Sequence, residues 1–182
     1  MTKPTPIPGE PGPAEMVERM IRVDHAGEYG AMRIYEGQLA VLRGRAASAA
    51  TIEHMAEQER RHLAVFDRLV AERGVRPTML APLWHVAGFA LGAATALLGE
   101  KAAMTCTSAV EEVIDRHYAE QAERLGPEEA ALKEHIEAFR AEEVEHRDTA
   151  LAHGAEETPG QRLLAEGIKA ATRLAIRLSE RI

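Results

Sequence analysis

The feature that most constrains the fold of this chain is a repeated spacing of glutamate and histidine. Glu-x-x-His occurs at Glu59 and His62 and again at Glu143 and His146. In a helix, residues three apart lie on one face about a turn apart, so each motif can direct a carboxylate and an imidazole at one point. A single motif of this kind is weak evidence in a chain rich in glutamate. Two of them predict a fold that brings two helices together.

Each motif is preceded by a further glutamate at nearly the same distance. Glu28 precedes Glu59 by 31 residues, and Glu111 precedes Glu143 by 32. The chain therefore has the pattern of two helical hairpins, each with a glutamate on its first helix and Glu-x-x-His on its second. Ferritin-like di-iron and di-manganese bundles follow this ligand rule. We predict an all-α, ferritin-like four-helix bundle that binds two metal ions through Glu28, Glu59, His62, Glu111, Glu143 and His146.

The predicted donor set suits a pair of iron ions. Carboxylates can bridge two metals, and a neutral imidazole can ligate each ion terminally, although spacing alone leaves manganese as an alternative. Four glutamates and two histidines would be costly to bury without a metal. Neighbouring glutamates could serve as ligands in place of those chosen. We choose the set that repeats the same spacing in both halves of the chain. The neighbouring glutamates are Glu57, Glu112, Glu142 and Glu145.

Composition supports a helical chain. Of 182 residues, 46% are hydrophobic, 28% are charged and only 4% are aromatic, and no alternating strand pattern is present. Five prolines in residues 1–13 predict a mobile tail there. We expect residues 14–182 to form a single ferritin-like domain. Its parts are a first hairpin at 14–73, an apolar segment at 77–99, a second hairpin at 100–153 and a last helix at 159–182, capped by Thr158 and Pro159.

The segment Pro77–Gly99 carries no charged residue over 23 positions, which is long enough to span a bilayer. Pro82, His85, Gly88 and Gly92 dilute its hydrophobicity. Three alternatives therefore stay open: a membrane span, a buried core helix, or a helix that faces a membrane surface.

The last predicted helix is amphipathic and basic. Residues 161–182 hold five basic and two acidic side chains, in a chain whose net charge is -7. A helix of this kind can bind an anionic membrane surface, or it can pack on the bundle with a solvated outer face. Together with the apolar segment, it favours a bundle with additional membrane-facing, amphipathic helices.

Several classes of protein are disfavoured. The negative net charge argues against nucleic acid as a partner. Cys106 is the only cysteine, which excludes an internal disulfide and a cysteine-rich zinc site. No Gly-x-Gly-x-x-Gly loop is present, so we expect no Rossmann dinucleotide domain. The first residues lack the apolar core of a signal peptide, and we expect a cytoplasmic origin.

The motifs resemble those of one family. Residues 24–31 read DHAGEYGA, and they are followed by Glu59-x-x-His62, Val110-Glu111-Glu112, His117-Tyr118 and Glu143-x-x-His146. This order and spacing resemble the demethoxyubiquinone hydroxylase family of ubiquinone biosynthesis over roughly residues 17–182. The resemblance implies that the six residues named above are iron ligands, with no ligand position missing.

The resemblance also implies an activity. It implies a monooxygenase with two iron ions that hydroxylates the ring of a polyprenylated quinone or quinol with O2, releases the second oxygen atom as water, and takes electrons from NADH. It further implies a peripheral protein at the cytoplasmic face of the bacterial cell membrane. Proteins of quinone biosynthesis, or a second copy of the chain, are candidate partners.

Three residues near the site have open roles. The resemblance places His117 and Tyr118 beside the site, in substrate or electron handling, whereas ordinary helix packing is the alternative. Asp115, four residues after Glu111, is either a carboxylate that orients a ligating imidazole or a surface group.

Other functions share parts of the pattern. A non-enzymatic ferritin-like protein for iron storage or detoxification would use the same ligands, but it would not need two apolar surface helices. A manganese catalase-like or peroxidase bundle is a second alternative. A helical membrane scaffold without metal is a third.

Overall fold

Six α-helices make up most of the part of the chain that the structure describes. The computed structural model describes residues 11–44, 46–157 and 159–182, and no strand occurs among them, which confirms the all-α prediction. The predicted tail at 1–13 falls mostly outside the described residues, and the first helix begins at Pro13, a favourable first position for proline. The helices are α1 (Pro13–Leu42), α2 (Ala49–Arg73), α3 (Ala81–Leu97), α4 (Glu100–Arg124), α5 (Ala130–Ala152) and α6 (Gln161–Ser179), with single 3-10 turns η1 (Pro127–Glu129) and η2 (Ala155–Glu157).

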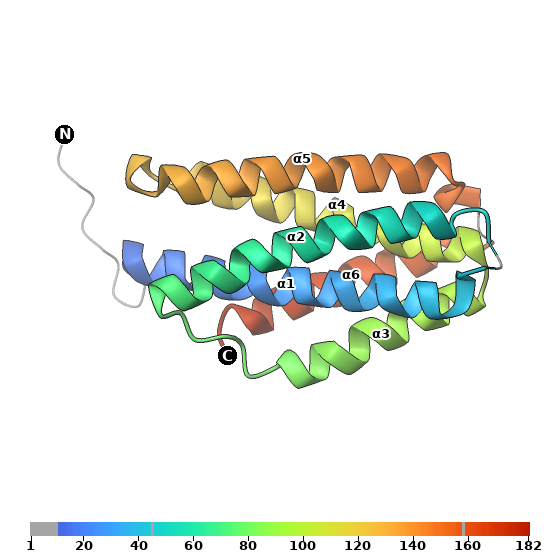
Figure 1. Cartoon of the computed structure of the whole chain (residues 1–182), viewed down its shortest axis with the longest axis horizontal. Coiled ribbons are helices and arrows are strands. Elements are labelled where there is room, and N and C mark those ends of the chain that lie inside the picture. The colour runs from blue at the N-terminus through green and yellow to red at the C-terminus, as the bar shows by residue number, and fades with distance from the viewer. Residues whose placement is uncertain (1–10, 45, 158) are drawn as a thin grey trace.

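Four of the helices form the predicted bundle. Helices α1 and α2 make one hairpin and α4 and α5 make the other, and all four run roughly along the long axis of the molecule (Figure 1). Helix α3 packs on α1, and α6 packs on α4. The architecture is therefore a ferritin-like bundle with two added outer helices, as the sequence predicts.

Glycines set two of the helix boundaries. Gly74 has a φ of 63° and ends α2 in the left-handed conformation common at helix ends. Gly160 has a φ of 73°, which a right-handed helix cannot include, so α6 begins at Gln161 rather than at Pro159. It ends at Ser179, three residues before the predicted end at Ile182. The predicted cap Thr158 lies outside the described residues.

Two of the three apolar clusters among the described residues fill the two ends of the bundle, and the third lies between α4 and α6. Each of these two clusters draws side chains from α1, α2, α4 and α5. The six predicted ligands lie on the same four helices, between the two clusters. One cluster includes Ile21, Phe66, Tyr118, Leu132 and Ile136, and the other includes Leu39, Ile52, Met55, Met104 and Ala150. The apolar ends hold the four helices in register, so the polar layer occupies the middle of the bundle.

Helix α3 is an outer helix and not a buried core helix. It buries Gly88 and Gly92 against α1, whereas Leu83, Val86 and Leu97 are exposed. The two backbones lie so close that a Cβ atom at Gly92 would lie 1.9 Å from the Ile34 carbonyl oxygen. Within the described part of the chain, no helix has both the length and the apolar character needed to cross a membrane.

Candidate metal centre

The six predicted ligands come together in the middle layer of the bundle. Each side chain is 3% exposed or less, although the six come from four different helices. The i,i+3 spacing does place the carboxylate and the imidazole of each motif on one inward face. By helix, the residues are Glu28 on α1, Glu59 and His62 on α2, Glu111 on α4, and Glu143 and His146 on α5.

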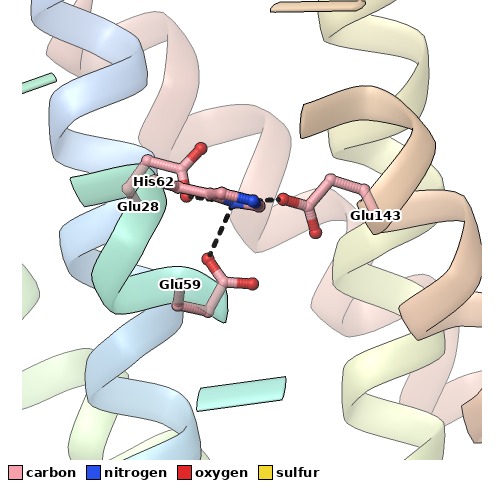
Figure 2. Close-up of side chains that lie close together, drawn as sticks. All are labelled: Glu28, Glu59, His62 and Glu143. Atoms are coloured by element: carbon pink, nitrogen blue, oxygen red, sulfur yellow. Dashed lines mark ion pairs between the residues drawn. The ribbon is translucent and has the colours of Figure 1, made fainter. Parts of the chain in front are cut away.

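One half of the cluster is centred on His62. Its Nδ1 atom lies 3.3 Å from Glu28 Oε2, 3.2 Å from Glu143 Oε1 and 3.9 Å from Glu59 Oε2. Figure 2 shows the three carboxylates pointing at this one nitrogen from three helices. The His62 ring is stacked on Phe139, with ring centroids 4.0 Å apart, and this contact helps to fix its orientation.

The other half repeats the arrangement around His146. Its Nδ1 atom lies 3.3 Å from Glu59 Oε1 and 3.2 Å from Glu143 Oε2. Glu59 and Glu143 thus each direct one oxygen toward His62 and the other toward His146. A carboxylate in this position can bridge two ions, whereas Glu28 and Glu111 each belong to one side only.

The donor atoms fit a pair of metal ions. Two overlapping groups, Glu28-Glu59-His62-Glu143 and Glu59-Glu111-Glu143-His146, have ligand atoms within 4.8 Å of one another. Two ligands of one ion that are each about 2.1 Å from it, at right angles, lie about 3 Å apart. Both oxygens of Glu59 and the Nδ1 atoms of both histidines are buried without a hydrogen-bond partner among the described residues. Buried polar atoms left in this way are costly, and bound cations would satisfy them.

The rival glutamates point elsewhere. Glu57 is exposed and pairs with Arg60 at 2.6 Å. Glu112 pairs with Lys169 of α6 at 2.6 Å. Glu145 is exposed, and Glu142 is outside the two donor groups. The fold therefore brings together the residues chosen from the repeated spacing, and their role as metal ligands stays a prediction.

Crowding of these charges shifts their protonation. Burial, followed by the charge of Glu143, raises the pKa of Glu59 and of Glu111 well above the usual value. Burial lowers the pKa of His62, but the carboxylates of Glu143 and Glu28, 3.2 and 3.3 Å from its Nδ1 atom, outweigh this effect and raise the pKa to about 11. Burial raises the pKa of Glu143, yet the imidazoles of His146 and His62, whose Nδ1 atoms each lie 3.2 Å from its carboxylate, outweigh burial and lower the pKa to about 2. Protons and cations therefore compete for these groups, and metal binding would displace protons from the cluster.

A second layer of side chains holds the outer nitrogens of the two histidines. His62 Nε2 lies 3.3 Å from Glu142 Oε2, and His146 Nε2 lies 3.1 Å from Gln58 Oε1. Gln58 also donates from Nε2 to Glu142 Oε2 at 2.8 Å, which joins the two outer contacts. With Nε2 engaged as the donor, each imidazole directs Nδ1 to the interior of the cluster, and its lone pair is available there when the ring is neutral.

The sequence missed this outer layer. From the sequence, Glu142 was considered only as a rival metal ligand. Gln58 was not considered, although it directly precedes Glu59. Asp115 had two alternatives, a carboxylate that orients an imidazole or a surface group, and the first of them is wrong. Asp115 pairs with Arg140 at 2.6 Å and with Arg147 at 3.2 Å, because the helix turns its side chain toward α5 arginines and away from the imidazoles.

Two tyrosines donate hydrogen bonds to Glu28 and Glu111, the glutamates that each belong to one donor group only. Tyr118 is buried and its hydroxyl donates to Glu28 Oε1. Tyr35, which the sequence reasoning missed, donates from its hydroxyl to Glu111 Oε1 at 3.0 Å. Its signal was available, since Tyr35 follows Glu28 by two helical turns on the same face. His117 lies farther from the six predicted ligands than Tyr118 does, and its Nε2 atom is 3.2 Å from Asp24 Oδ1.

An apolar cavity of about 170 Å³ reaches the cluster from the side of α3 and α6. Glu28, Glu59, Glu111 and Glu143 line its inner end. Asp24, His117 and Tyr118 also line it, and the rest of the wall is mainly apolar, with Ile34, Trp84, Leu91, Val110, Ile114 and Ala175. A ring-sized apolar molecule in this cavity would meet the donor cluster directly.

Comparison with known proteins agrees with these features. The family model described as ubiquinone biosynthesis protein COQ7 matches residues 15–179. A 3-demethoxyubiquinol 3-hydroxylase of Rhodospirillum rubrum is 58% identical over 97% of this chain and 83% of its own length. A rat protein named NADPH-dependent 3-demethoxyubiquinone 3-hydroxylase, mitochondrial, is 54% identical over 91% of this chain and 77% of its own.

Similarity extends to more distant organisms. The 5-demethoxyubiquinone hydroxylase, mitochondrial, of Saccharomyces cerevisiae is 42% identical over 93% of this chain and 79% of its own length. The family model covers nearly all of the described helices, including the four that carry the donor cluster and the two that complete the cavity. The chain therefore belongs to the ubiquinone biosynthesis protein COQ7 family.

Proposed function

We propose that this chain is a monooxygenase that hydroxylates the ring of a demethoxyubiquinol intermediate with O2 in ubiquinone biosynthesis. One observation carries the proposal: a buried cluster with two overlapping donor groups opens directly onto an apolar cavity. Storage of iron would use the cluster, but it gives no reason for an apolar cavity that ends at the ligands. The names of the relatives support the same activity.

Two iron ions are the proposed cofactor. Glu28 and His62 would hold one ion, Glu111 and His146 the other, and Glu59 and Glu143 would bridge them. When bound, the pair of ions supplies the redox chemistry of O2 activation, which ordinary side chains lack. The second layer around the histidines keeps the Nδ1 atoms directed inward, so the chain presents a donor set that is already arranged.

The cavity wall positions the substrate and excludes water. Its apolar residues favour an uncharged quinol ring, and the donor cluster at the inner end places the reacting carbon next to the oxygen chemistry. Tyr118 lines the cavity and donates to Glu28, so its hydroxyl holds that carboxylate on the substrate side. Exclusion of water protects reactive species from side reactions.

We further propose that NADH supplies the electrons. The family resemblance supports NADH, whereas the rat relative is named as NADPH-dependent. The two coenzymes differ by one phosphate, so turnover with each at matched concentrations decides between them. Equal or faster turnover with NADPH would overturn the choice of NADH.

We also propose that the protein is peripheral, at the cytoplasmic face of the bacterial cell membrane, with α3 and α6 toward the lipid. Exposed apolar side chains on these helices include Leu83, Val86, Leu97, Leu163 and Leu174. The cavity lies between the same two helices, so an isoprenoid tail could reach it from the bilayer. Exposed arginines of α6 suit anionic headgroups.

Co-sedimentation with anionic phospholipid vesicles tests this orientation. Val86→Asp together with Leu163→Asp should weaken vesicle binding strongly, whereas Leu151→Asp changes an exposed leucine on α5 and should not. Equal vesicle binding by both variants would contradict the proposal. A loss of oligomers in the double variant, measured by light scattering, would instead assign the surface to a second copy or to another protein of quinone biosynthesis.

The decisive experiment follows oxygen-18 from labelled O2 into a short-tail demethoxyquinol. Iron-loaded protein with NADH should place the label in the new ring hydroxyl. Glu59→Ala should abolish the product and the bound iron, because this residue belongs to both donor groups. Wild-type protein that holds two irons per chain and forms no product would overturn the monooxygenase proposal in favour of storage.

A further inference from the structure

The proposed hydroxylation needs protons at the inner end of an apolar cavity. One oxygen atom of O2 enters the ring as hydroxyl and the other leaves as water, so each turnover takes up two electrons and two protons. The reduced nicotinamide supplies the electrons. The wall of the cavity is mainly apolar, and such a wall conducts protons poorly. Polar groups that cross it are therefore candidates for a proton path.

Asp24 is a buried carboxylate that the donor cluster does not use. It is 3% exposed, it lines the cavity, and it precedes Glu28 on α1 by one helical turn. Asp24 Oδ1 accepts a hydrogen bond from Gln121 Nε2 at 2.8 Å and lies 3.2 Å from His117 Nε2. Asp24 Oδ2 has no hydrogen-bond partner among the described residues. Burying an ionised carboxylate oxygen without a hydrogen-bond partner costs free energy, and a proton on that oxygen lowers the cost by removing the charge.

His117 lies in the wall between this cavity and an outer groove. The groove has a volume of about 350 Å³ and lies between α4 and α6. His117 lines both hollows, and its side chain is 13% exposed. Its Nε2 atom faces Asp24 Oδ1 and also lies 2.9 Å from Gln121 Nε2, so the relay uses the tautomer in which Nε2 carries the proton. In that tautomer Nδ1 is the nitrogen left to exchange protons with water. The groove itself is charged, with Glu112, Arg116, Glu120, Arg173, Arg177 and Glu180 around it.

We propose that His117 and Asp24 form a proton relay from the outer groove into the substrate cavity. This inference rests on the proposed function. Asp24 gives up a proton from Oδ2 to the cavity and regains one at Oδ1 from His117 Nε2. His117 takes a replacement proton at Nδ1 from water in the groove. Rotation of the Asp24 carboxyl group about its Cβ–Cγ bond and a flip of the His117 ring, which carries the new proton from the groove side to the Asp24 side, reset the relay. Two such cycles supply both protons of one turnover.

The surroundings keep both groups able to hold a proton. Burial raises the pKa of Asp24 above its usual value, and the charge of Glu28 on α1 acts in the same direction, against the hydrogen bonds of His117 and Gln121. Burial lowers the pKa of His117, but the hydrogen bond and charge of Asp24 outweigh it and the pKa is raised. The other charged groups around His117 are Glu120 of α4 and Glu180, which directly follows α6; both raise its pKa further. The groove also holds Arg116, Arg173 and Arg177.

Chemical rescue separates a relay from a packing role. His117→Ala should lower turnover by about 100-fold, the lower end of what positioned acid–base groups contribute. Added imidazole can enter the solvent-facing groove and should restore turnover in a saturable manner. His117→Gln and Asp24→Asn keep the size and a hydrogen bond but cannot pass a proton in this way, so both should stay slow, with wild-type iron content and thermal stability. A packing role predicts near wild-type turnover for these two variants.

A matched pair on the surface provides the control. His25 Nε2 lies 2.9 Å from Asp67 Oδ1 between α1 and α2, away from the cavity wall. His25→Ala should keep its turnover, and imidazole should have no effect on it. If His117→Ala does not fold, His117→Gln and Asp24→Asn still carry the test.

Each outcome of the experiment decides a separate point. Full turnover and an unchanged pH profile in His117→Gln and Asp24→Asn would overturn the relay while the hydroxylase activity stands. Folded, iron-loaded His117→Ala that is slow but does not respond to imidazole would also overturn it. Wild-type protein without any hydroxylated product would refute the proposed function, and the relay with it.

Discussion

Replacing Gly92 with alanine should push α3 away from α1. The added Cβ atom would lie 1.9 Å from the Ile34 carbonyl oxygen and 2.8 Å from its carbonyl carbon, whereas ordinary van der Waals contact begins at 3.4 Å. The obstacle is helix backbone, which cannot rotate aside as a side chain can. The two helices must therefore separate by about 1.5 Å at this point or distort by a similar amount.

The expected loss of stability follows from two opposing effects. Overpacking of a close contact costs typically about 1–3 kcal/mol, and a backbone overlap of this size belongs at the upper end. Alanine in a helix interior returns about 0.5–1 kcal/mol relative to glycine. The net loss is about 2 kcal/mol, which lowers Tm by about 4–8 °C in a chain of this length.

Thermal unfolding followed by far-ultraviolet circular dichroism measures this change. Gly167→Ala is the matched control, since Gly167 lies in α6 and an added Cβ atom there would meet no neighbouring side chain or helix within 4 Å among the described residues. This control should raise Tm by about 1–4 °C. Gly92→Ala should also raise the KM for the quinol, because α3 forms part of the cavity wall. A Gly92→Ala variant as stable as the wild type would refute the close-contact argument.

Further predictions concern the metal centre. Glu142→Gln removes the charged partner of His62 Nε2 and should weaken iron(II) binding by about 10–100-fold in calorimetric titration; unchanged affinity would contradict the role of the outer layer. Iron uptake should release protons, because a pKa of about 11 keeps His62 protonated at pH 7 and binding requires its deprotonated form. The raised pKa of Glu59 acts in the same direction. Affinity should therefore rise with pH, and titrations in two buffers of different ionisation enthalpy should give different heats; identical heats would argue against it. His146→Ala should lose iron in elemental analysis, whereas His153→Ala, at the exposed end of α5, should retain it.

The helical fold and the set of candidate ligands could be predicted from the amino-acid sequence without the structure. Both follow from local geometry: a spacing of three residues puts Glu59 and His62 on one helical face wherever the helix is placed. The repeat at Glu143, with a glutamate 31 or 32 residues before each motif, was enough to pair the hairpins. In the folded chain these residues are all buried in one layer.

How the side chains meet between helices could not be predicted in this way and depends on the packed fold. Three features depend on the rotation of each helix about its axis. They are the positions of Glu59 and Glu143 between the two histidines, the outer contacts of Gln58 and Glu142, and the failure of Asp115 to reach an imidazole. The same holds for α3. In the sequence its glycines only lower the hydrophobicity of a possible membrane segment, whereas in the fold they form a contact surface for α1. Sequence periodicity fixes which residues share a face of one helix, whereas packing between helices determines which faces touch.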